Sequence, residues 1–196
     1  MDQYIADQLS SSRLLIEKIV NSKTFLETIK ISALACVDAL KKGKKILLAG
    51  NGRSAGDAQH MAGEFVCRFN FDRPALSAIA LTTDTSILTA IGNDYGYENV
   101  FARQIQALGQ EGDIFIAYST SGKSKNILMA LNEAKSQGLI SIGMTGNQKG
   151  AFIDLCDYPI EIPSNETPHI QEGHLIVGHI ICGLIEEAIF KDYKYA

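Results

Sequence analysis

The sequence predicts an α/β protein with a doubly wound, five-stranded parallel sheet. Short apolar segments alternate with longer segments of helical periodicity, and the apolar segments are continuous, as in parallel strands covered on both faces. The chain has 196 residues, of which 46% are hydrophobic, so it can bury a full core. No internal repeat, low-complexity tract or Pro/Ser-rich linker interrupts it, and we therefore expect one domain over residues 1–196.

Two helical segments come first. Apolar residues recur at helical spacing over Gln3–Val20, and a second pattern over Lys23–Lys42 ends at Gly43, a residue typical of helix ends. We expect residues 1–42 to form N-terminal helices, and residues 43–196 to form the α/β core with a C-terminal helix.

Strands and helices then alternate. The expected strands are Lys45–Ala49, Ser77–Leu81, Asp113–Tyr118, Ile140–Met144 and Tyr158–Ile162. The expected helices are Ala55–Arg68, Thr85–Ile91, Glu98–Leu108, Ser124–Gln137 and Gln171–Phe190. This order is that of a flavodoxin-like sheet, in which ligands bind outside the carboxyl ends of the strands. We therefore look for functional residues in the loops that follow the strands.

Composition narrows the class of protein. The net charge is −4 with no long basic run, which argues against partners such as nucleic acid or an anionic membrane. The polar start of the chain has no signal segment, and no apolar run approaches the roughly 20 residues that span a bilayer. The cysteines, which form no CxxC, are Cys36, Cys67, Cys156 and Cys182. Widely spaced thiols are typical of a reducing compartment, so we expect a soluble cytoplasmic protein.

One predicted helix carries His60 and Glu64, four residues apart and therefore on one face. A neighbouring apolar stripe includes Met61 and Phe65, so the pair lies beside a buried face. An imidazole next to a carboxylate can bind a metal or move protons. The alternative is an ordinary surface ion pair.

The glycine-rich loop Gly50–Ala55 precedes this helix and fits the GxGxxG/A pattern of dinucleotide sites. The outward-facing His60 and Glu64 have no use in such a site. The acidic residue expected after the second strand is also doubtful, because Leu81 is followed by Thr82–Asp84. The glycines otherwise allow a tight reversal of the chain that is compatible with any ligand.

A second loop, Ala117–Ser124, nearly matches a Walker A sequence, but Ala117 replaces its first glycine, so the nucleotide cradle is incomplete. Its hydroxyl residues are Ser119, Thr120, Ser121 and Ser124. Several hydroxyls at a helix N-terminus suit one phosphate monoester, whereas a helix cap needs a single hydroxyl. The loop therefore predicts phosphate binding, and Lys123 could add a charge.

Three histidines lie near the C-terminus: His169, His174 and His179. Spacing by five rotates each by about 140° from the last, so they cannot share a helix face. We expect His174 in the core. His179 stays a candidate as a partner for the first pair.

Together these motifs resemble one enzyme family over almost the whole chain. They are Gly50-Asn51-Gly52-x-Ser54, His60-x-x-x-Glu64, Gly92-Asn93-Asp94-Tyr95-Gly96, Ser119-Thr120-Ser121-Gly122-x-Ser124, and Ile170-Gln171-Glu172 followed by His179. The resemblance is to bacterial phosphoheptose isomerases, which have a sugar-isomerase (SIS) domain. It implies conversion of sedoheptulose 7-phosphate to D-glycero-D-manno-heptose 7-phosphate, a first step toward the heptose of lipopolysaccharide, capsule or other surface glycans. It also implies a homotetramer, assembled through N-terminal helices, with active sites between subunits.

The resemblance assigns roles residue by residue. Phosphate binding falls on Ser119, Thr120, Ser121 and Ser124. Sugar contacts fall on Asn51, Gly52, Ser54, Asn93, Asp94 and Gln171. One zinc ion per subunit would be held by His60, Glu64, Gln171 and His179. The implied catalytic acid/base pair is Glu64 and His179. Arg53, Lys123 and Pro168 depart from the usual pattern, and Arg53 adds positive charge among the substrate-binding residues.

An aldose–ketose interconversion needs a base, an acid and a group that stabilises the oxyanion, and zinc can polarise the carbonyl. A metal-bound side chain is not free to take a proton, so we expect Glu64 to be the principal base and leave His179 as ligand or acid. Gln171 and His179 are about 12 Å apart along a helix. Either Gln171 precedes the helix, or the ligands come from different subunits.

Two other functions remain open at this stage. One is a non-catalytic SIS scaffold that binds the replication initiator, although Glu64 and His179 have no purpose there. The other is an isomerase or regulator that acts on another sugar phosphate, such as a hexose 6-phosphate.

Overall fold

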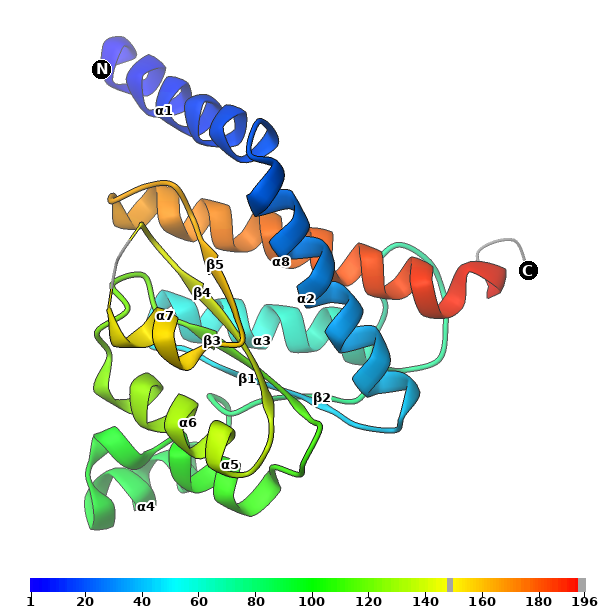
Figure 1. The fold of residues 1–196 in the computed structure, drawn as a ribbon. Coiled ribbons are helices and arrows are strands. Elements are labelled where there is room, and N and C mark those ends of the chain that lie inside the picture. Colours follow the sequence, from blue (N-terminus) through cyan, green and yellow to red (C-terminus); the bar gives the residue numbers. More distant parts are fainter. Residues whose placement is uncertain (148–149, 194–196) are drawn as a thin grey trace.

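The centre of the molecule is a five-stranded parallel sheet with strand order β2-β1-β3-β4-β5 (Figure 1). The structure is a computed structural model and describes residues 1–147 and 150–193. The strands are β1 Ile46–Ala49, β2 Ala78–Ala80, β3 Ile114–Tyr118, β4 Ile140–Thr145 and β5 Tyr158–Glu161. β1 pairs in parallel with both β2 and β3, so Leu48 lies opposite Ala80 and Ile116. This order confirms the flavodoxin-like sheet that the sequence predicts.

The helices are α1 Asp2–Val20, α2 Lys23–Lys41, α3 Arg53–Val66, α4 Thr85–Tyr95, α5 Ala102–Leu108, α6 Lys125–Ser136, α7 Ala151–Leu155 and α8 Thr167–Phe190, with short 3-10 turns η1 Tyr97–Asn99 and η2 Lys191–Tyr193. Several helices differ from the expectation by more than two residues. α4 continues to Tyr95 instead of ending at Ile91, and α5 begins at Ala102 instead of Glu98. α7 was not expected, because five residues are too few to show a helical period. α8 begins at Thr167 rather than at Gln171, since Pro168 occupies the first turn, where a missing N–H costs nothing.

The helices cover both faces of the sheet. Ile46 and Leu48 belong to one hydrophobic cluster and Leu47 and Ala49 to another, as the two-residue period of a strand requires. The first cluster packs against α2, α3 and α8, and the second against α4, α5, α6 and α7. Both faces of the sheet are therefore buried, which explains the continuous apolar strands.

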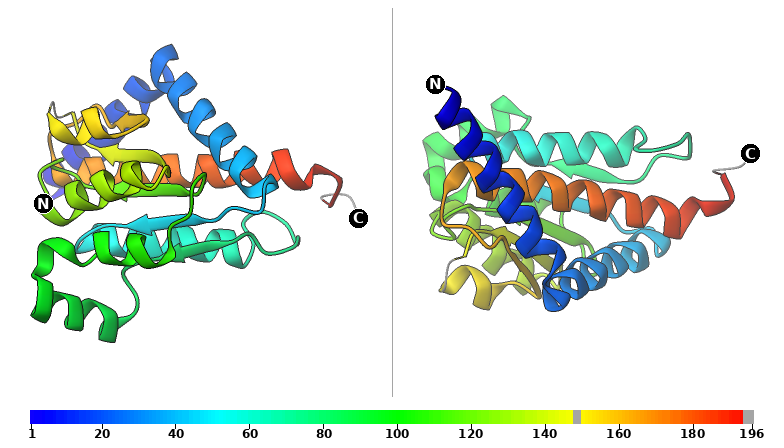
Figure 2. Two further views of the ribbon diagram at one scale, coloured as in Figure 1. Left: turned by 60° about the horizontal axis from the view of Figure 1, so that its bottom comes forward. Right: turned by 90° about the horizontal axis from the view of Figure 1, so that it is seen from above.

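α8 lies between α2 and α3 across one face of the sheet (Figure 2). It is the one described helix long and apolar enough to cross a membrane by length and composition, so the expectation that no apolar run approaches that length is wrong. A core helix meets the same test, and Val177, Ile181 and Ile185 of α8 are fully or almost fully buried in the first cluster. The apolar character of α8 is thus explained by its packing.

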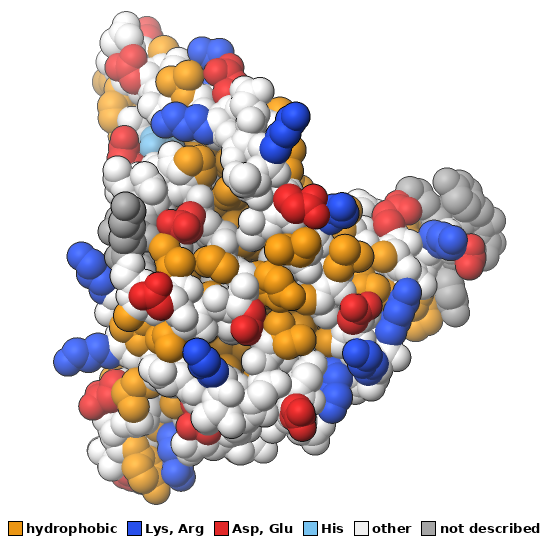
Figure 3. Space-filling model, viewed as in Figure 1, with side chains coloured by type: hydrophobic (Ala, Val, Ile, Leu, Met, Phe, Trp, Pro, Cys, Tyr) orange, Lys and Arg blue, Asp and Glu red, His pale blue; other side chains and the backbone are white. Residues whose placement is uncertain are grey.

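α1 extends from the body of the molecule and is mostly uncovered. Only Leu15 and Ile19 of this helix are buried, whereas Tyr4, Ile5 and Leu9 are each more than half exposed. Hydrophobic side chains also gather over α2 on the face drawn in Figure 3. The N-terminal helices therefore present apolar surface that the chain itself does not cover.

Candidate functional site

Three side chains from distant parts of the chain meet where α3 and α8 cross. His60 Nε2 lies 2.8 Å from His179 Nε2 and 3.4 Å from Glu64 Oε1. One potential ligand atom from each residue falls within 4.8 Å of the others. The structure thus brings the imidazole of His179 to the His60/Glu64 pair on α3, as the family resemblance implies.

The close approach of the two helices has a local cause. A Cβ on Gly178 would lie 2.8 Å from Sδ of Met61, so the glycine lets α8 approach α3 without displacing the end of that side chain. Gly178 precedes His179 and Met61 follows His60, so this close approach lies beside the two imidazoles. The ring of Phe69 packs beside that of His179, with centroids 5.4 Å apart. The His179 ring therefore has neighbours on two sides.

This donor set fits a metal ion. Two imidazole nitrogens at 2.8 Å must either share a proton or face a common cation. Two histidines and one carboxylate form a known catalytic zinc set, in which the remaining position is left for water or substrate. The side chain of His60 is 45% exposed and that of Glu64 is 22% exposed, so the cluster is open to a ligand from outside.

Gln171 does not lie beside this cluster on the same helix. It is part of α8, which begins at Thr167, and eight helical residues separate it from His179, or about 12 Å along the axis. The alternative in which Gln171 precedes the helix is therefore wrong. The remaining alternative, in which Gln171 serves a site completed by another subunit, stays a prediction.

The serines of the hydroxyl loop between β3 and α6 bond within the loop, where Ser121 Oγ accepts the backbone N–H of Lys123 at 3.3 Å. Ser124 is the N-cap residue of α6, yet its side chain makes no capping hydrogen bond. Instead Ser119 Oγ donates a hydrogen bond to Ser124 Oγ at 3.3 Å. Gly122 adopts a φ of +62°, which turns the loop over the start of the helix. Hydroxyls that are not used for capping favour the phosphate interpretation over a plain helix cap.

The glycine-rich loop is tied to the same helix through Asn51. The amides of Asn51 and Asn126 exchange two hydrogen bonds of 2.8 Å, and Tyr97 Oη donates to Asn51 Oδ1 at 3.2 Å. Gly52 has a φ of +56°, as a tight turn requires. Sequence reasoning missed Asn126 and Tyr97. A polar Asn in the buried first turn of α6 was the available signal for the first, and nothing local marked the second.

Asp84, the acidic residue that a dinucleotide site would use after the second strand, already caps a helix. Asp84 is the N-cap of α4, and its Oδ1 accepts the backbone N–H of Ile87 at 2.9 Å. It therefore serves a helix terminus rather than a ribose hydroxyl.

The other predicted sugar contacts lie in α4 and at the start of α3. Asn93 and Asp94 lie in α4, both exposed, with Asn93 Nδ2 donating to Asp94 Oδ1. Ser54 is buried in the first turn of α3, next to Arg53, whose Nη2 lies 3.5 Å from Asp57 Oδ1. Burial raises the pKa of the Asp57 carboxyl, while Arg53 and His60 oppose that rise. Asp57 was not expected from the sequence.

The two other C-terminal histidines have structural surroundings. His174 is buried against the ring of Tyr118, and burial lowers the pKa of its imidazole to about 4. The prediction that it lies in the core is confirmed. His169 Nδ1 lies 3.1 Å from Glu172 Oε2, which also accepts a hydrogen bond from Ser12 of α1. Both residues thus join α1 to the start of α8.

Comparisons with known proteins agree with this arrangement. The family described as SIS domain matches residues 9–146. The chain is 57% identical over 187 residues to a phosphoheptose isomerase of Burkholderia pseudomallei, covering 95% of each sequence. It is similar in structure to phosphoheptose isomerases from Francisella tularensis (TM-score 0.90, 37% identity, 94% and 97% covered) and Neisseria gonorrhoeae (TM-score 0.88, 36% identity, 95% and 98% covered). The chain therefore belongs to the phosphoheptose isomerase family of SIS-domain proteins.

Proposed function

We propose that this protein is an aldose–ketose isomerase that interconverts sedoheptulose 7-phosphate and D-glycero-D-manno-heptose 7-phosphate. The observation that carries the proposal is the meeting of His60, Glu64 and His179, with 2.8 Å between the two imidazoles. Relatives at 57% identity bear the name phosphoheptose isomerase, and that name supplies the substrate.

The two parts of the site are connected by α3. The helix begins at Arg53, in the turn whose Asn51 is bonded to the start of α6, and carries His60 about 10 Å further along its axis. A phosphate held at the N-terminus of α6 by Ser119, Ser124 and their neighbours would fix one end of an extended sugar. Its carbonyl end would then reach the α3–α8 crossing.

Glu64 is the proposed base. In the ketose-to-aldose direction it removes a proton from C1, which leaves an ene-diolate with the negative charge on O2, and it returns the proton to C2. The proton of the O1 hydroxyl must pass to O2 in the same cycle. His179 serves as the acid for this oxygen proton transfer, or as a ligand that holds the metal, and the two roles have different tests.

We also propose one zinc ion per subunit, held by His60, Glu64, His179 and Gln171, with Gln171 coming from another subunit. Glu64 would bind through one carboxylate oxygen and keep the other free to act as the base. When bound, zinc supplies a Lewis acid that polarises the sugar carbonyl. The test is to remove metal with a chelator and to titrate zinc back while following heat of binding and activity. Recovery at substoichiometric zinc with a single binding event supports the proposal. Activity that is indifferent to both treatments contradicts it.

A homotetramer with sites at subunit interfaces is the proposed assembly. The uncovered apolar residues of α1 and the position of Gln171 on α8 support it. Sedimentation of the wild type and of Leu9→Glu gives the test. A wild-type monomer with full activity would contradict both the assembly and the shared site. We further propose a cytoplasmic enzyme that supplies heptose for surface glycans.

The deciding experiment for the function is NMR of the purified protein with sedoheptulose 7-phosphate, in which the aldose product is followed by its anomeric protons. Formation of the heptose aldose supports the proposal. A parallel assay with fructose 6-phosphate measures preference for a shorter sugar. Turnover of the hexose alone would favour an isomerase of another sugar phosphate. Turnover of neither sugar would favour a non-catalytic SIS scaffold.

A further inference from the structure

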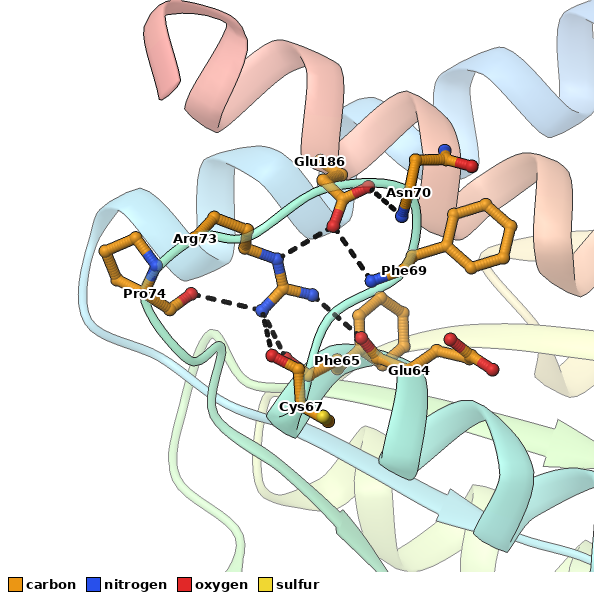
Figure 4. A network of polar contacts seen from close by, with 8 residues as sticks. All are labelled: Glu64, Phe65, Cys67, Phe69, Asn70, Arg73, Pro74 and Glu186. Carbon is orange, nitrogen blue, oxygen red and sulfur yellow. Dashed lines mark hydrogen bonds and ion pairs between the residues drawn. The ribbon is translucent and has the colours of Figure 1, made fainter. Parts of the chain in front are cut away.

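A buried ion pair lies next to the candidate site but outside it. Arg73 Nε donates to Glu186 Oε1 at 3.0 Å, and each of the two side chains is 1% exposed (Figure 4). Arg73 belongs to the loop that follows α3, and Glu186 to the second half of α8. The pair therefore joins the helix that carries His60 and Glu64 to the helix that carries His179.

On the α3 side, the guanidinium completes the end of the helix. Arg73 Nη2 donates to the backbone carbonyl of Glu64 and Nη1 to that of Phe65, both at 2.7 Å. Nη1 also reaches the carbonyls of Cys67 and Pro74. The last carbonyls of a helix lack partners within it, and a positive charge there is favourable. Arg73 therefore fixes the backbone of Glu64 itself.

On the α8 side, the carboxylate holds the loop against His179. Glu186 accepts the backbone N–H of Phe69 at 3.0 Å and that of Asn70 at 2.7 Å. Glu186 comes seven residues after His179, so both project from one face of α8. The Phe69 ring packs against the His179 ring. The Glu186 carboxylate, by binding the backbone of Phe69, therefore fixes the position of a side chain that contacts His179.

We propose that Arg73 and Glu186 are positioning residues for the isomerase site, which set the separation of Glu64 and His179. This inference rests on the proposed function. The crossing of α3 and α8 is fixed at one point by the Gly178–Met61 contact and at a second by this pair. Two apolar residues could hold the helices together, but they could not bind the loop amides and the helix carbonyls. The ion pair therefore fixes the positions of the loop amides and the helix carbonyls, which apolar packing alone would not do.

Glu186→Gln is the variant that tests the proposal, and the chain offers a matched control. Asp113 is likewise a buried carboxylate that pairs with a cation, Lys45, and accepts two backbone N–H groups, those of Lys45 and Gln110. It lies immediately before β3, outside the crossing of α3 and α8. Glu186→Gln and Asp113→Asn therefore make the same chemical change, one beside the site and one away from it.

Both variants should unfold at a lower temperature than the wild type, but they should differ in catalysis. Well below the unfolding temperature, we expect Glu186→Gln to lower kcat by about 100-fold, as misplacement of reacting groups by about 1 Å can do, with KM little changed. Asp113→Asn should keep the wild-type kcat. Arg73→Lys keeps the positive charge but loses the planar guanidinium with its several donors, so it should also lower kcat. If Glu186→Gln does not fold, Arg73→Lys is tested in its place.

Crystal structures of the wild type and of Glu186→Gln give a second readout that does not depend on turnover. We expect the His60–His179 separation and the Phe69 ring position to change in the variant. A folded variant with wild-type kcat and unchanged separation overturns the inference, as does an equal loss of kcat in Asp113→Asn. If the wild type does not turn over the heptose phosphate, the proposed function fails, and the separation still tests the positioning.

Discussion

Polar groups at the amino end of the sheet are hydrogen-bonded, whereas several buried polar atoms at its carboxyl end have no partner among the described residues. At the amino end, Asp113 accepts hydrogen bonds from Lys45 Nζ and from two backbone N–H groups. Nearby, Asp157 Oδ2 accepts both the N–H and the hydroxyl of Ser141 at 2.8 Å, and Ser141 Oγ accepts the N–H of Asp157. These hydrogen bonds join the starts of four strands, β1, β3, β4 and β5.

At the carboxyl end, buried polar atoms lack partners. Within residues 1–147 and 150–193 these atoms include Asp57 Oδ2, Thr145 Oγ1 and both ring nitrogens of His174. Thr145 ends β4, and Asp57 lies in the second turn of the helix that follows β1. Since buried polar groups are normally bonded, exceptions gathered at one end mark the end that serves a ligand. The proposed phosphate loop, between β3 and α6, lies at this end.

The largest effect that would sharpen this contrast is the loss of catalysis in Glu64→Gln. Without the base, we expect kcat to fall by about 10³-fold, within the range that general-base removal gives. The unfolding temperature should hardly change, because Glu64 is partly exposed. The NMR assay and calorimetry measure the two quantities. Glu27→Gln, an exposed helix glutamate paired with Lys30, is the control and should keep full activity.

Asp113→Ala should give the largest loss of stability. It leaves Lys45 and two backbone N–H groups without their acceptor, and removing one partner of a buried pair costs about 3 kcal/mol of the free energy of unfolding. Urea denaturation measures the loss, and kcat should remain that of the wild type. A variant that loses activity while keeping its stability would reverse the roles we assign to the two ends.

His174→Leu should change the pH dependence of stability. Burial lowers the pKa of His174 from 6.5 to about 4, so between these values the unfolded chain takes up a proton that the native chain does not. The free energy of unfolding therefore falls as pH falls through this window, by about 2–3 kcal/mol in total. Urea denaturation at about pH 7 and about pH 5 measures the slope. The variant should lack this contribution, and an unchanged slope would contradict it.

Ser124→Ala should give the smallest of these effects. Removing one hydroxyl that binds a phosphate dianion should raise KM for the sugar phosphate by about tenfold, with a smaller effect on kcat. Ser136→Ala is the matched control, since Ser136 lies at the other end of α6 and bonds the carbonyl of Glu133. Initial-rate kinetics measure KM for both variants and for the wild type. Equal KM values for Ser124→Ala and the wild type would remove this hydroxyl from the phosphate site.

The sequence was sufficient for the fold because its signals are local. Continuous apolar strands between helical patterns predicted the sheet, and the four-residue spacing predicted that His60 and Glu64 share a face. The meeting of His60 with His179 depends on contact across 119 positions, which no local pattern encodes. The resemblance to a family, rather than periodicity, suggested that contact.

Other errors have physical reasons. Pro168 was considered for its chemistry and not as a helix start, so the first turn of α8 was missed and Gln171 was left free to precede the helix. The pairing of Arg73 with Glu186 joins residues 113 positions apart and gave no sequence signal. The sequence thus pointed to the candidate ligand-binding residues but not to the pair that we propose positions them.

α8 follows all five strands in the sequence, which has a consequence for biosynthesis. Its residues Val177, Ile181 and Ile185 complete the core on one face of the sheet, against α2 and α3. During translation the strands emerge before α8, so that face stays open until α8 has left the ribosome. A nascent chain of this protein would therefore expose a wide apolar surface until α8 can pack against α2 and α3.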